Sequence, residues 1–324
     1  TNMTLHAQCE KIINELQISW QYPVITELTV YNQQKQNKKY IGIPWATILD
    51  KQLDLTQVIR IIKKYISIEP SIYEYTTCCQ HISYKQLIPL FKYLGIKHVY
   101  ASHKIIGLDI LNSIHLYPLP LYAANIEDSS RNTLYKTLTA YSETPHSGLL
   151  WKKREYLYCF MGAYNSRWYL TSIRDKILTL THPSNTFIKN TKTWHFENIV
   201  YGKQIQKVRF NEEEERRNKI KLNIYNTILA SSRFSLCPSG TGPNSIRFWE
   251  SLGFGSIPIL LADTLELPPH PLWDTSIIRI PESKISNVNT ILSNISSEKE
   301  NSMRKNCLLL YDDFKDSFIV NNRT

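Results

Sequence analysis

The sequence predicts an α/β protein with two domains and parallel sheets. The chain has 324 residues, about twice the length of a typical domain. Short β-rich runs alternate with segments of helical periodicity, an order typical of parallel sheets. The alternation occurs on both sides of the polar segment Ile126–Lys152, so we expect the domain junction within or just after it. The expected domains are residues 1–150 and 151–300, followed by a terminal segment, 301–324.

Hydrophobic patterning places the elements of the first domain. Apolar residues spaced three and four apart indicate helices, and runs rich in β-branched residues indicate strands. The expected strands are Val24–Val30, Ile72–Thr77 and Lys97–Ala101, and the expected helices are Leu55–Ile66 and one from an N-cap at Ser83 to a stop at Gly95.

The second domain shows the same rhythm, with buried strands between helices. The expected strands are Tyr156–Phe160, Arg233–Cys237 and Ser256–Leu261, and the expected helices are Ser166–Leu178, Asn211–Ser231 and Asn244–Leu252. A last amphipathic helix is expected from about Ser297 to Phe314.

Composition narrows the class of protein. Hydrophobic residues make up 42% of the chain, which excludes a disordered protein, and no apolar run approaches the roughly 18 residues of a membrane span. The segment Thr1–Leu16 lacks the apolar core of a signal peptide, so we expect a cytoplasmic protein. A formal charge of +10 favours phosphate-bearing partners or an anionic membrane surface, such as the inner face of the membrane.

Cysteines and charge runs carry little specific chemistry here. The six cysteines form no C-x-x-C pair and no regular spacing, which predicts reduced, buried thiols and gives no support for a zinc site. The acidic run Glu212–Glu215 precedes Arg216 and Arg217 at helical i,i+4 spacing. Such spacing predicts a solvated helix face rather than a nucleic-acid site.

Glycine concentrates in one region. Four of the ten glycines fall between Gly240 and Gly255, in a pattern of strand, small-residue loop, helix, glycine stop and strand. Gly240 and Gly242 allow backbone amides to approach a ligand closely. Asn244 or Ser245 is expected to cap the following helix, whose N-terminus would attract an anion such as a diphosphate.

Two charged residues strengthen this interpretation. Arg247 lies in the first turn of the expected helix, where a cation is unfavourable unless it faces a bound anion. Glu250 shares its helix face, so phosphate and sugar hydroxyls could be held side by side. An ordinary βαβ turn with a surface Arg–Glu pair is the alternative. Neither a Walker A loop nor G-x-G-x-x-G occurs in the chain.

The chain resembles the exostosin family of glycosyltransferases, which use nucleotide-sugar donors. The likeness rests on the run Cys237–Glu250 with Gly255–Leu261, and on Arg154–Gly162 with Arg174, which resembles the family pattern R-x-Y-L-x-x-F-x-G…R. Weaker similarity to bacterial, polysaccharide-associated members covers Tyr40–Trp45, Thr77–His81, Ser102–Lys104 and Pro118–Tyr122. Ser239 departs from the basic residue that many relatives carry.

The resemblance implies a GT-B fold, in which two Rossmann-like domains face each other across a cleft and a C-terminal helix crosses back to the first. It also implies inverting, metal-independent transfer from a nucleoside-diphosphate sugar, expected to be a UDP-sugar, to a hydroxyl of a glycan or lipid-linked glycan of the polysaccharide, capsule or lipopolysaccharide type. No D-x-D occurs in the sequence, so the carboxylate pair that would hold a divalent ion on the donor is absent. No cofactor is expected.

The resemblance also implies which residues bind the donor. Arg174 and Arg247 would meet the diphosphate charge, and Glu250 would bind the ribose hydroxyls. Arg167 is a further arginine, which would lie either at the diphosphate or on the protein surface. The full set of implied donor-binding residues is Gly162, Arg174, Ser239, Gly240, Thr241, Gly242, Asn244, Ser245, Arg247 and Glu250.

An inverting transfer needs a base that takes the acceptor's proton. His81 and His103 follow two expected strands of the first domain, and ligands gather at the carboxyl ends of parallel strands. Histidine suits this role at neutral pH. Asp109 and Glu74 are further candidates, and both histidines could instead be loop residues that bind the backbone.

Two other classes of function remain open at this point. A catalytically silent glycan-binding or scaffold member would bind the donor without turnover. A nucleic-acid-binding protein would use the +10 charge, but the basic residues are dispersed and no nucleic-acid motif occurs, so no nucleic-acid partner is expected.

Overall fold

A computed structural model describes residues 3–67, 74–140, 144, 146–192, 206–207 and 209–319 of the chain. The contacts within the chain divide it into two compact units. The first unit comprises Thr1–Leu121, Thr264–Pro268 and Ser317–Thr324, and the second comprises Tyr122–Asp263 and Pro269–Asp316. The division falls at Leu121, before the expected junction within or just after Ile126–Lys152.

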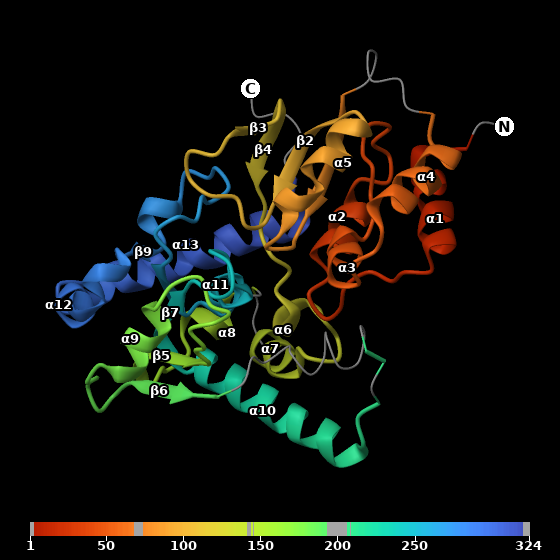
Figure 1. The fold of residues 1–324 in the computed structure, drawn as a ribbon. Helices are drawn as coiled ribbons and strands as arrows, with labels where there is room; N and C mark the ends of the chain where they lie inside the picture. Colours follow the sequence, from red (N-terminus) through yellow and green to blue (C-terminus); the bar gives the residue numbers. More distant parts are fainter. Residues whose placement is uncertain are drawn as a thin grey trace. The chain divides into compact units, whose positions relative to one another are not determined.

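A four-stranded sheet forms the core of the first unit (Figure 1). The spatial order is β1-β2-β4-β3, in which the first three strands are parallel and β3 pairs antiparallel with β4. The strands are β1 (Tyr75–Cys79), β2 (Ile96–Ala101), β3 (Ile110–Leu111) and β4 (Ile114–Pro118). The strands expected around Thr77 and at Lys97–Ala101 are therefore confirmed, while Ile72 and Tyr73 lie outside the described residues.

The helices of the first unit include one that was expected as a strand. They are α1 (Leu5–Leu16), α2 (Thr26–Gln33), α3 (Trp45–Asp50), α4 (Leu55–Tyr65), the 3-10 helix η1 (Tyr84–Leu87) and α5 (Ile88–Tyr93). The expected helix at Leu55–Ile66 is confirmed, with Asp54 as its N-cap. The expectation of a strand at Val24–Val30 is wrong, because the segment buries residues 26, 27, 30 and 31, a helical spacing, against the rest of the unit.

An excursion from the second half of the chain completes the first unit. Residues Thr264–Pro268 pair with the loop after β2, where the Ile106 N–H donates to the Thr264 carbonyl at 2.9 Å. Lys104, only 1% exposed, pairs through Nζ with Glu266 at 2.5 Å and with Asp109 at 2.9 Å. A buried lysine requires such carboxylate partners, so the excursion is part of this unit's folded structure.

Five parallel strands form the sheet of the second unit, in the order β6-β5-β7-β8-β9. They are β5 (Tyr156–Gly162), β6 (Phe187–Asn190), β7 (Ser232–Pro238), β8 (Ile257–Leu261) and β9 (Ile278–Arg279). The three strands expected here are confirmed. Because β6 follows β5 in the chain but β7 lies on the other side of β5, the strand order reverses between β5 and β7.

The connecting helices complete the parallel α/β arrangement (Figure 1). They are α6 (Ala124–Glu127), α7 (Thr133–Thr139), α8 (Ser147–Leu150), α9 (Ile173–Thr179), α10 (Glu212–Ala230), α11 (Ile246–Phe254), η3 (Trp273–Thr275), η4 (Glu282–Asn287), α12 (Val288–Ser293) and α13 (Ser297–Asp316). Asn211 and Glu214 form a capping box on α10. The helix expected at Ser166–Leu178 begins only at Ile173, because the residues before it form a loop.

The last helix lies in the second unit. α13 buries Met303, Cys307, Leu310 and Phe314, and packs on α11. The chain returns to the first unit only after the helix ends, where the Phe318 N–H donates to Gln33 Oε1 at 3.0 Å. The helix expected to cross back is therefore a helix of the second unit followed by a short returning segment.

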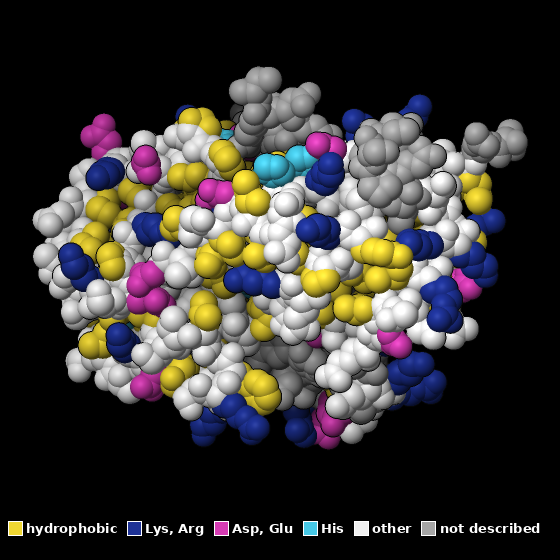
Figure 2. Space-filling model, turned by 45° about the horizontal axis from the view of Figure 1, so that its top comes forward, with side chains coloured by type: hydrophobic (Ala, Val, Ile, Leu, Met, Phe, Trp, Pro, Cys, Tyr) yellow, Lys and Arg dark blue, Asp and Glu magenta, His cyan; other side chains and the backbone are white. Residues whose placement is uncertain are grey.

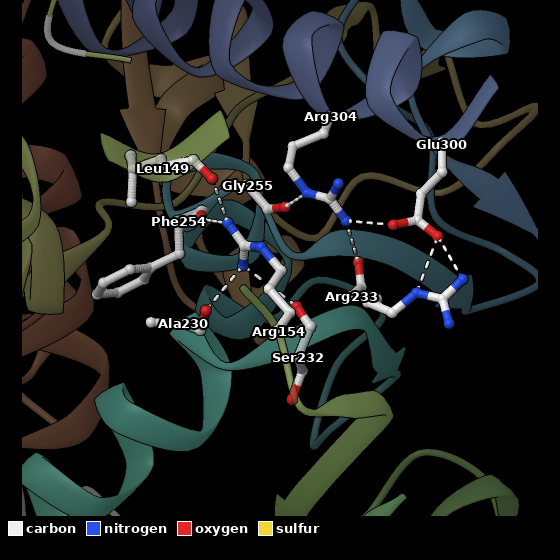
Figure 3. Close-up of polar contacts among 9 residues, drawn as sticks. All are labelled: Leu149, Arg154, Ala230, Ser232, Arg233, Phe254, Gly255, Glu300 and Arg304. Carbon is white, nitrogen blue, oxygen red and sulfur yellow. Dashed lines mark hydrogen bonds and ion pairs between the residues drawn. The ribbon is translucent and has the colours of Figure 1, made fainter. Parts of the chain in front are cut away.

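Arg154 and Arg304 donate hydrogen bonds to backbone carbonyls at the amino edge of the second sheet (Figure 3). Arg154 donates to four carbonyls, those of Leu149, Ala230, Ser232 and Phe254, at 2.8–3.2 Å. Arg304 donates to the Gly255 carbonyl at 2.8 Å and to Glu300 at 2.9 Å. These guanidinium groups satisfy carbonyls at the C-terminal ends of α10 and α11, where positive charge is favourable. The arginine of the R-x-Y-L motif is thus structural.

Surface features agree with the sequence interpretation of charge. On the face drawn in Figure 2, Lys and Arg side chains are scattered among acidic and apolar groups rather than gathered into one stripe. All six cysteines are buried and form no disulfide. Within the described residues, no helix has the length and apolar character needed to cross a membrane.

Candidate functional site

The candidate site lies where β5 and β7 end. These strands are parallel neighbours, with Tyr158 opposite Phe234 and Cys159 opposite Ser235. β5 ends at Gly162, and β7 leads into the loop at residues 239–245. The strand order reverses between them, and in open α/β sheets ligands bind outside the carboxyl ends at such a position.

Two buried guanidinium groups meet at this point. Arg174 comes from α9 and is 7% exposed, and Arg247 comes from the first turn of α11 and is 8% exposed. A Cβ atom at Gly162 would lie 3.2 Å from Nη1 of Arg174 and 3.2 Å from Nη2 of Arg247. A Cβ at Gly240 would lie 3.2 Å from Nη2 of Arg174. A side chain at either position would crowd a guanidinium group, and at Gly162 it would also lie 2.7 Å from the Phe160 ring, so glycine leaves room for the arginines.

Backbone carbonyls hold the two arginines. Arg174 Nε donates to the Ser239 carbonyl at 3.0 Å and its Nη1 to the Ala163 carbonyl at 3.3 Å, while Arg247 Nη2 donates to the Met161 carbonyl. In the described part of the chain neither guanidinium forms an ion pair with a carboxylate, and the buried Arg247 Nη1 has no hydrogen-bond partner.

Burial and the neighbouring Arg247 charge lower the pKa of Arg174 to about 9. Two buried like charges that form no ion pair with a carboxylate are costly, so the pair would be stabilised by an anion. The geometry thus favours binding of a phosphate group between α9 and α11.

The glycine-rich loop lies beside the two arginines, and several of its polar groups bind one another. Ser245 is the N-cap of α11 and its Oγ accepts the Arg247 N–H at 3.2 Å, which resolves the choice between Asn244 and Ser245. Asn244 Oδ1 instead accepts from Ser245 N–H and Trp249 Nε1, both at 2.9 Å. The Gly240 N–H donates to the Gly242 carbonyl at 2.9 Å. The N–H groups of Gly240, Ser245 and Arg247 are therefore engaged within the protein, and the guanidinium groups of Arg174 and Arg247 are further donors at this place. Thr241 lies in this loop and is half-buried.

Ser239 is tied to a neighbouring carboxylate. Its hydroxyl donates to Glu282 Oε1 at 3.2 Å, and Thr171 donates to the same oxygen at 2.7 Å. Burial raises the pKa of Glu282. Ser239 therefore supports the loop next to Arg174, whose Nε binds the Ser239 carbonyl.

Glu250 is enclosed by the second unit. Its carboxylate is fully buried; Oε2 accepts the Asn125 N–H at 3.3 Å, and Oε1 has no partner in the described part of the chain. Burial raises the pKa of Glu250 to about 7, opposed by Arg131 and Arg247. The expected contact with ribose needs an accessible carboxylate oxygen, which this arrangement does not offer.

Arg167 lies on the loop after β5 and is exposed, which agrees with the surface position given as one of its two alternatives.

The two histidines of the first unit follow neighbouring strands. Cys79 and Ala101 are paired in the register of β1 and β2, and His81 and His103 each lie two residues beyond that pair. His81 Nε2 lies 2.7 Å from Asp50 Oδ1, and its Nδ1 accepts the Ser83 N–H at 2.9 Å. Both ring nitrogens of His81 are thus engaged. Burial and the proximity of His81 lower the pKa of His103 to about 3, so His103 is neutral at physiological pH.

The remaining base candidates are placed differently. Glu74 precedes β1 and lies at the opposite, amino edge of the sheet, where its Oε2 is 2.9 Å from His98 Nε2. This position rules it out as a base at the carboxyl edge. Asp109 is exposed and pairs with Lys104.

The sequence did not predict the buried acid Glu27, which binds Gln80, the residue before His81. Glu27 accepts the Gln80 N–H at 2.9 Å and the Ala46 N–H at 3.2 Å, and burial raises its pKa to about 8. Asp50 was also missed. No local pattern marks either residue, because their partners come from other segments. The described residues contain no group of three His, Cys, Asp or Glu side chains that could hold a metal ion.

Comparison with known proteins shows which protein family the second half of the chain resembles. Residues 138–295 match the model of the exostosin GT47 domain. A probable glucuronosyltransferase of Oryza sativa subsp. japonica is 33% identical over 101 residues, which are 31% of this chain and 23% of that protein. Exostosin-1 of Drosophila melanogaster is 27% identical over 150 residues, 46% of this chain and 18% of that protein. A probable beta-1,4-xylosyltransferase of Arabidopsis thaliana is 36% identical over 67 residues, 20% of this chain and 16% of that protein. The chain therefore spans less than a quarter of the length of these relatives.

Proposed function

Because residues 138–295 form an exostosin GT47 domain, as the motifs predicted, we propose that this protein transfers a sugar from a nucleoside-diphosphate donor to a hydroxyl of a glycan. The donor is proposed to be a UDP-sugar, and the acceptor a growing or lipid-linked glycan. The observation that carries the proposal is the pair Arg174 and Arg247, two buried cations around Gly162 with no carboxylate ion pair among the described residues.

The proposed reaction inverts the anomeric carbon and uses no metal. The acceptor oxygen attacks the anomeric carbon, the bond from that carbon to the diphosphate oxygen breaks, and the nucleoside diphosphate leaves with the electron pair. Arg174 and Arg247 would stabilise the charge that develops on the leaving diphosphate, a role that a metal ion fills in other enzymes. Gly162 and Gly240 support the proposal because they let both guanidinium groups reach the strand ends.

The acceptor's proton would pass to a base in the first unit. Of the two histidines we favour His103, because its lowered pKa keeps the imidazole in the neutral form. A neutral imidazole can accept a proton, and the pKa of His103 would rise beside an anionic donor. This assignment requires the GT-B arrangement, in which the two units face each other across the reacting groups, and we propose that arrangement too.

A nucleotide panel tests the proposal. We expect UDP and UDP-sugars to raise the melting temperature more than the corresponding nucleoside does, since the diphosphate supplies the charge. The shift should persist in excess EDTA. A shift that EDTA removes would contradict the metal-independent part, and equal responses to uridine and UDP would contradict diphosphate binding. Donor binding without transfer or hydrolysis would instead indicate a silent glycan-binding member.

The location of the protein can be tested through its binding to membranes. We propose a cytoplasmic enzyme that binds the inner face of the membrane through its basic surface. Co-sedimentation with anionic vesicles at low and high salt measures this, because electrostatic binding weakens as salt rises. An absence of binding at low salt would contradict it.

A further inference from the structure

An exposed tryptophan lies in the loop whose following residues contact the arginine pair. The loop between β5 and α9 carries Trp168, which is 63% exposed, although tryptophan is usually largely buried. The next residue, Tyr169, packs its ring 4.8 Å from the guanidinium carbon of Arg174. After that, the Leu170 N–H donates to the Gly240 carbonyl at 2.9 Å. Two consecutive residues thus tie the position of Trp168 to the anion site.

The loop that carries Trp168 is a compact turn. The Asn165 side chain accepts the Arg167 N–H at 2.9 Å, and the Asn165 carbonyl accepts the N–H groups of Trp168 and Tyr169 at 3.2 and 3.1 Å. The Arg167 guanidinium lies 5.2 Å from the indole centroid and limits the orientations of the ring. The indole is therefore presented by a turn held through backbone hydrogen bonds.

We propose that the indole of Trp168 is the surface on which the nucleobase of the donor stacks. In a nucleoside diphosphate, a single ribose separates the diphosphate from a flat base. A diphosphate held by Arg174 and Arg247 places its base near the residues that adjoin this site, and Trp168 adjoins it through Tyr169. Stacking on an aromatic ring suits every base, because each base has a π-face. This inference rests on the proposed function, because it requires the diphosphate to lie at the arginine pair.

A matched control exists in the same unit. Trp151 is 79% exposed, but it ends α8 just before the amino end of β5, at the edge of the sheet opposite Gly162. Trp168→Ala and Trp151→Ala therefore remove the same exposed side chain at opposite edges of one sheet. Trp168→Phe keeps an aromatic face and tests whether stacking is the cause.

Isothermal titration with UDP and with inorganic pyrophosphate separates the base from the diphosphate. We expect Trp168→Ala to weaken UDP binding by about 5- to 100-fold, the range expected for one stacked base, and to leave pyrophosphate binding unchanged. Trp168→Phe should restore most of the affinity for UDP. Trp151→Ala should change neither, and UDP should quench tryptophan fluorescence in the wild type but not in Trp168→Phe.

The outcomes distinguish this inference from the proposed function. If the wild type binds neither UDP nor pyrophosphate, both fail. If both ligands bind and Trp168→Ala has no effect on UDP, only the stacking inference is overturned. Equal losses for UDP and pyrophosphate would overturn it too, because they would show that the variant disturbs the arginine pair. A loss confined to the KM for a glycan acceptor would assign the ring to the acceptor and overturn it as well.

Discussion

Arg174 and Arg247 both approach Gly162, and each guanidinium has a nitrogen 3.2 Å from the position that a Cβ would take there. The two side chains come from α9 and α11 and bind backbone carbonyls rather than carboxylates. The strand ends thus concentrate positive charge at the position where the sheet reverses its order. An anionic ligand would relieve the mutual repulsion.

Arg174→Gln and Arg247→Gln are expected to weaken UDP binding by about 10- to 100-fold each, because each removes a charge-assisted hydrogen bond to phosphate. The free energy of unfolding should change little, since each variant also removes repulsion between buried charges. Isothermal titration and urea unfolding measure the two effects. Arg216→Gln, on the exposed face of α10, is the control. Unchanged UDP affinity in both variants would refute the site.

Gly162→Ala is expected to lower the free energy of unfolding by about 1–3 kcal/mol, because the added methyl would lie 2.7 Å from the Phe160 ring and would crowd both guanidinium groups. UDP affinity should fall as well. Gly240→Ala meets only Arg174, so a smaller loss is expected. Thermal unfolding and titration compare the two variants. Equal stability of Gly162→Ala and wild type would show that the guanidinium groups move away at no cost.

Glu27→Gln is expected to change the pH dependence of stability. The pKa of Glu27 is raised from 4.5 to about 8, so the folded state binds its proton more tightly than the unfolded state does. This contribution is fully present below pH 4.5 and is lost as the pH rises through 8. Glutamine resembles the protonated acid and does not titrate, so the variant does not lose this stability as the pH rises. The free energy of unfolding of the variant minus that of the wild type should therefore increase from pH 5 to pH 8. Urea unfolding at several pH values measures it, with the exposed Glu298→Gln as control. Parallel curves would contradict the burial of a carboxyl at position 27.

His103→Gln is expected to reduce turnover by about 10²- to 10⁴-fold and to leave UDP affinity unchanged, because the loss of a general base affects the chemical step. The pKa of His103 is lowered to about 3, so its neutral form persists throughout pH 5–8. The pH profile of kcat/KM, which reports the free enzyme, should therefore show no acidic limb near 6.5. Donor hydrolysis or transfer assays measure both. Full turnover in the variant would move the base to another residue.

Arg154→Ala is expected to lower the free energy of unfolding by about 2–4 kcal/mol, because four carbonyls lose a buried donor. UDP affinity of the folded variant should remain, since Arg154 lies at the amino edge and the arginine pair at the carboxyl edge. Thermal unfolding and titration separate these effects. Loss of UDP affinity without loss of stability would contradict the structural role.

Local signals in the sequence predict the segment from β7 to β8 well. The glycines, the N-cap at Ser245 and the apolar run of β8 all lie within a short stretch, and each specifies the conformation of its own neighbours. α4 and α10 were predicted from patterns within their own segments, and in the structure Asp54 and Asn211 cap them.

Contacts between distant segments were not predictable from one sequence. The β-branched run Val24–Val30 suggests a strand, but Glu27 binds the Gln80 amide and the segment folds as a helix. The hydrophobic periodicity of the sequence likewise does not predict that Arg174 and Arg247 approach each other at Gly162. Glu250 has the spacing of a ligand-binding residue, yet it is fully buried and accepts the N–H of Asn125, which lies far away in the sequence.

The excursion at Thr264–Pro268 governs how the protein can be divided for experiments. A recombinant fragment ending at Leu121 would lack Glu266, so the enclosed ammonium of Lys104 would keep Asp109 as its carboxylate partner and lose the closer one. A fragment starting at Tyr122 would carry those five residues without the surface that they cover. Expression of either half by simple truncation is therefore expected to yield aggregated material. A design that joins both returning segments, Thr264–Pro268 and Ser317–Thr324, to the N-terminal piece through short linkers would keep all parts of that unit together.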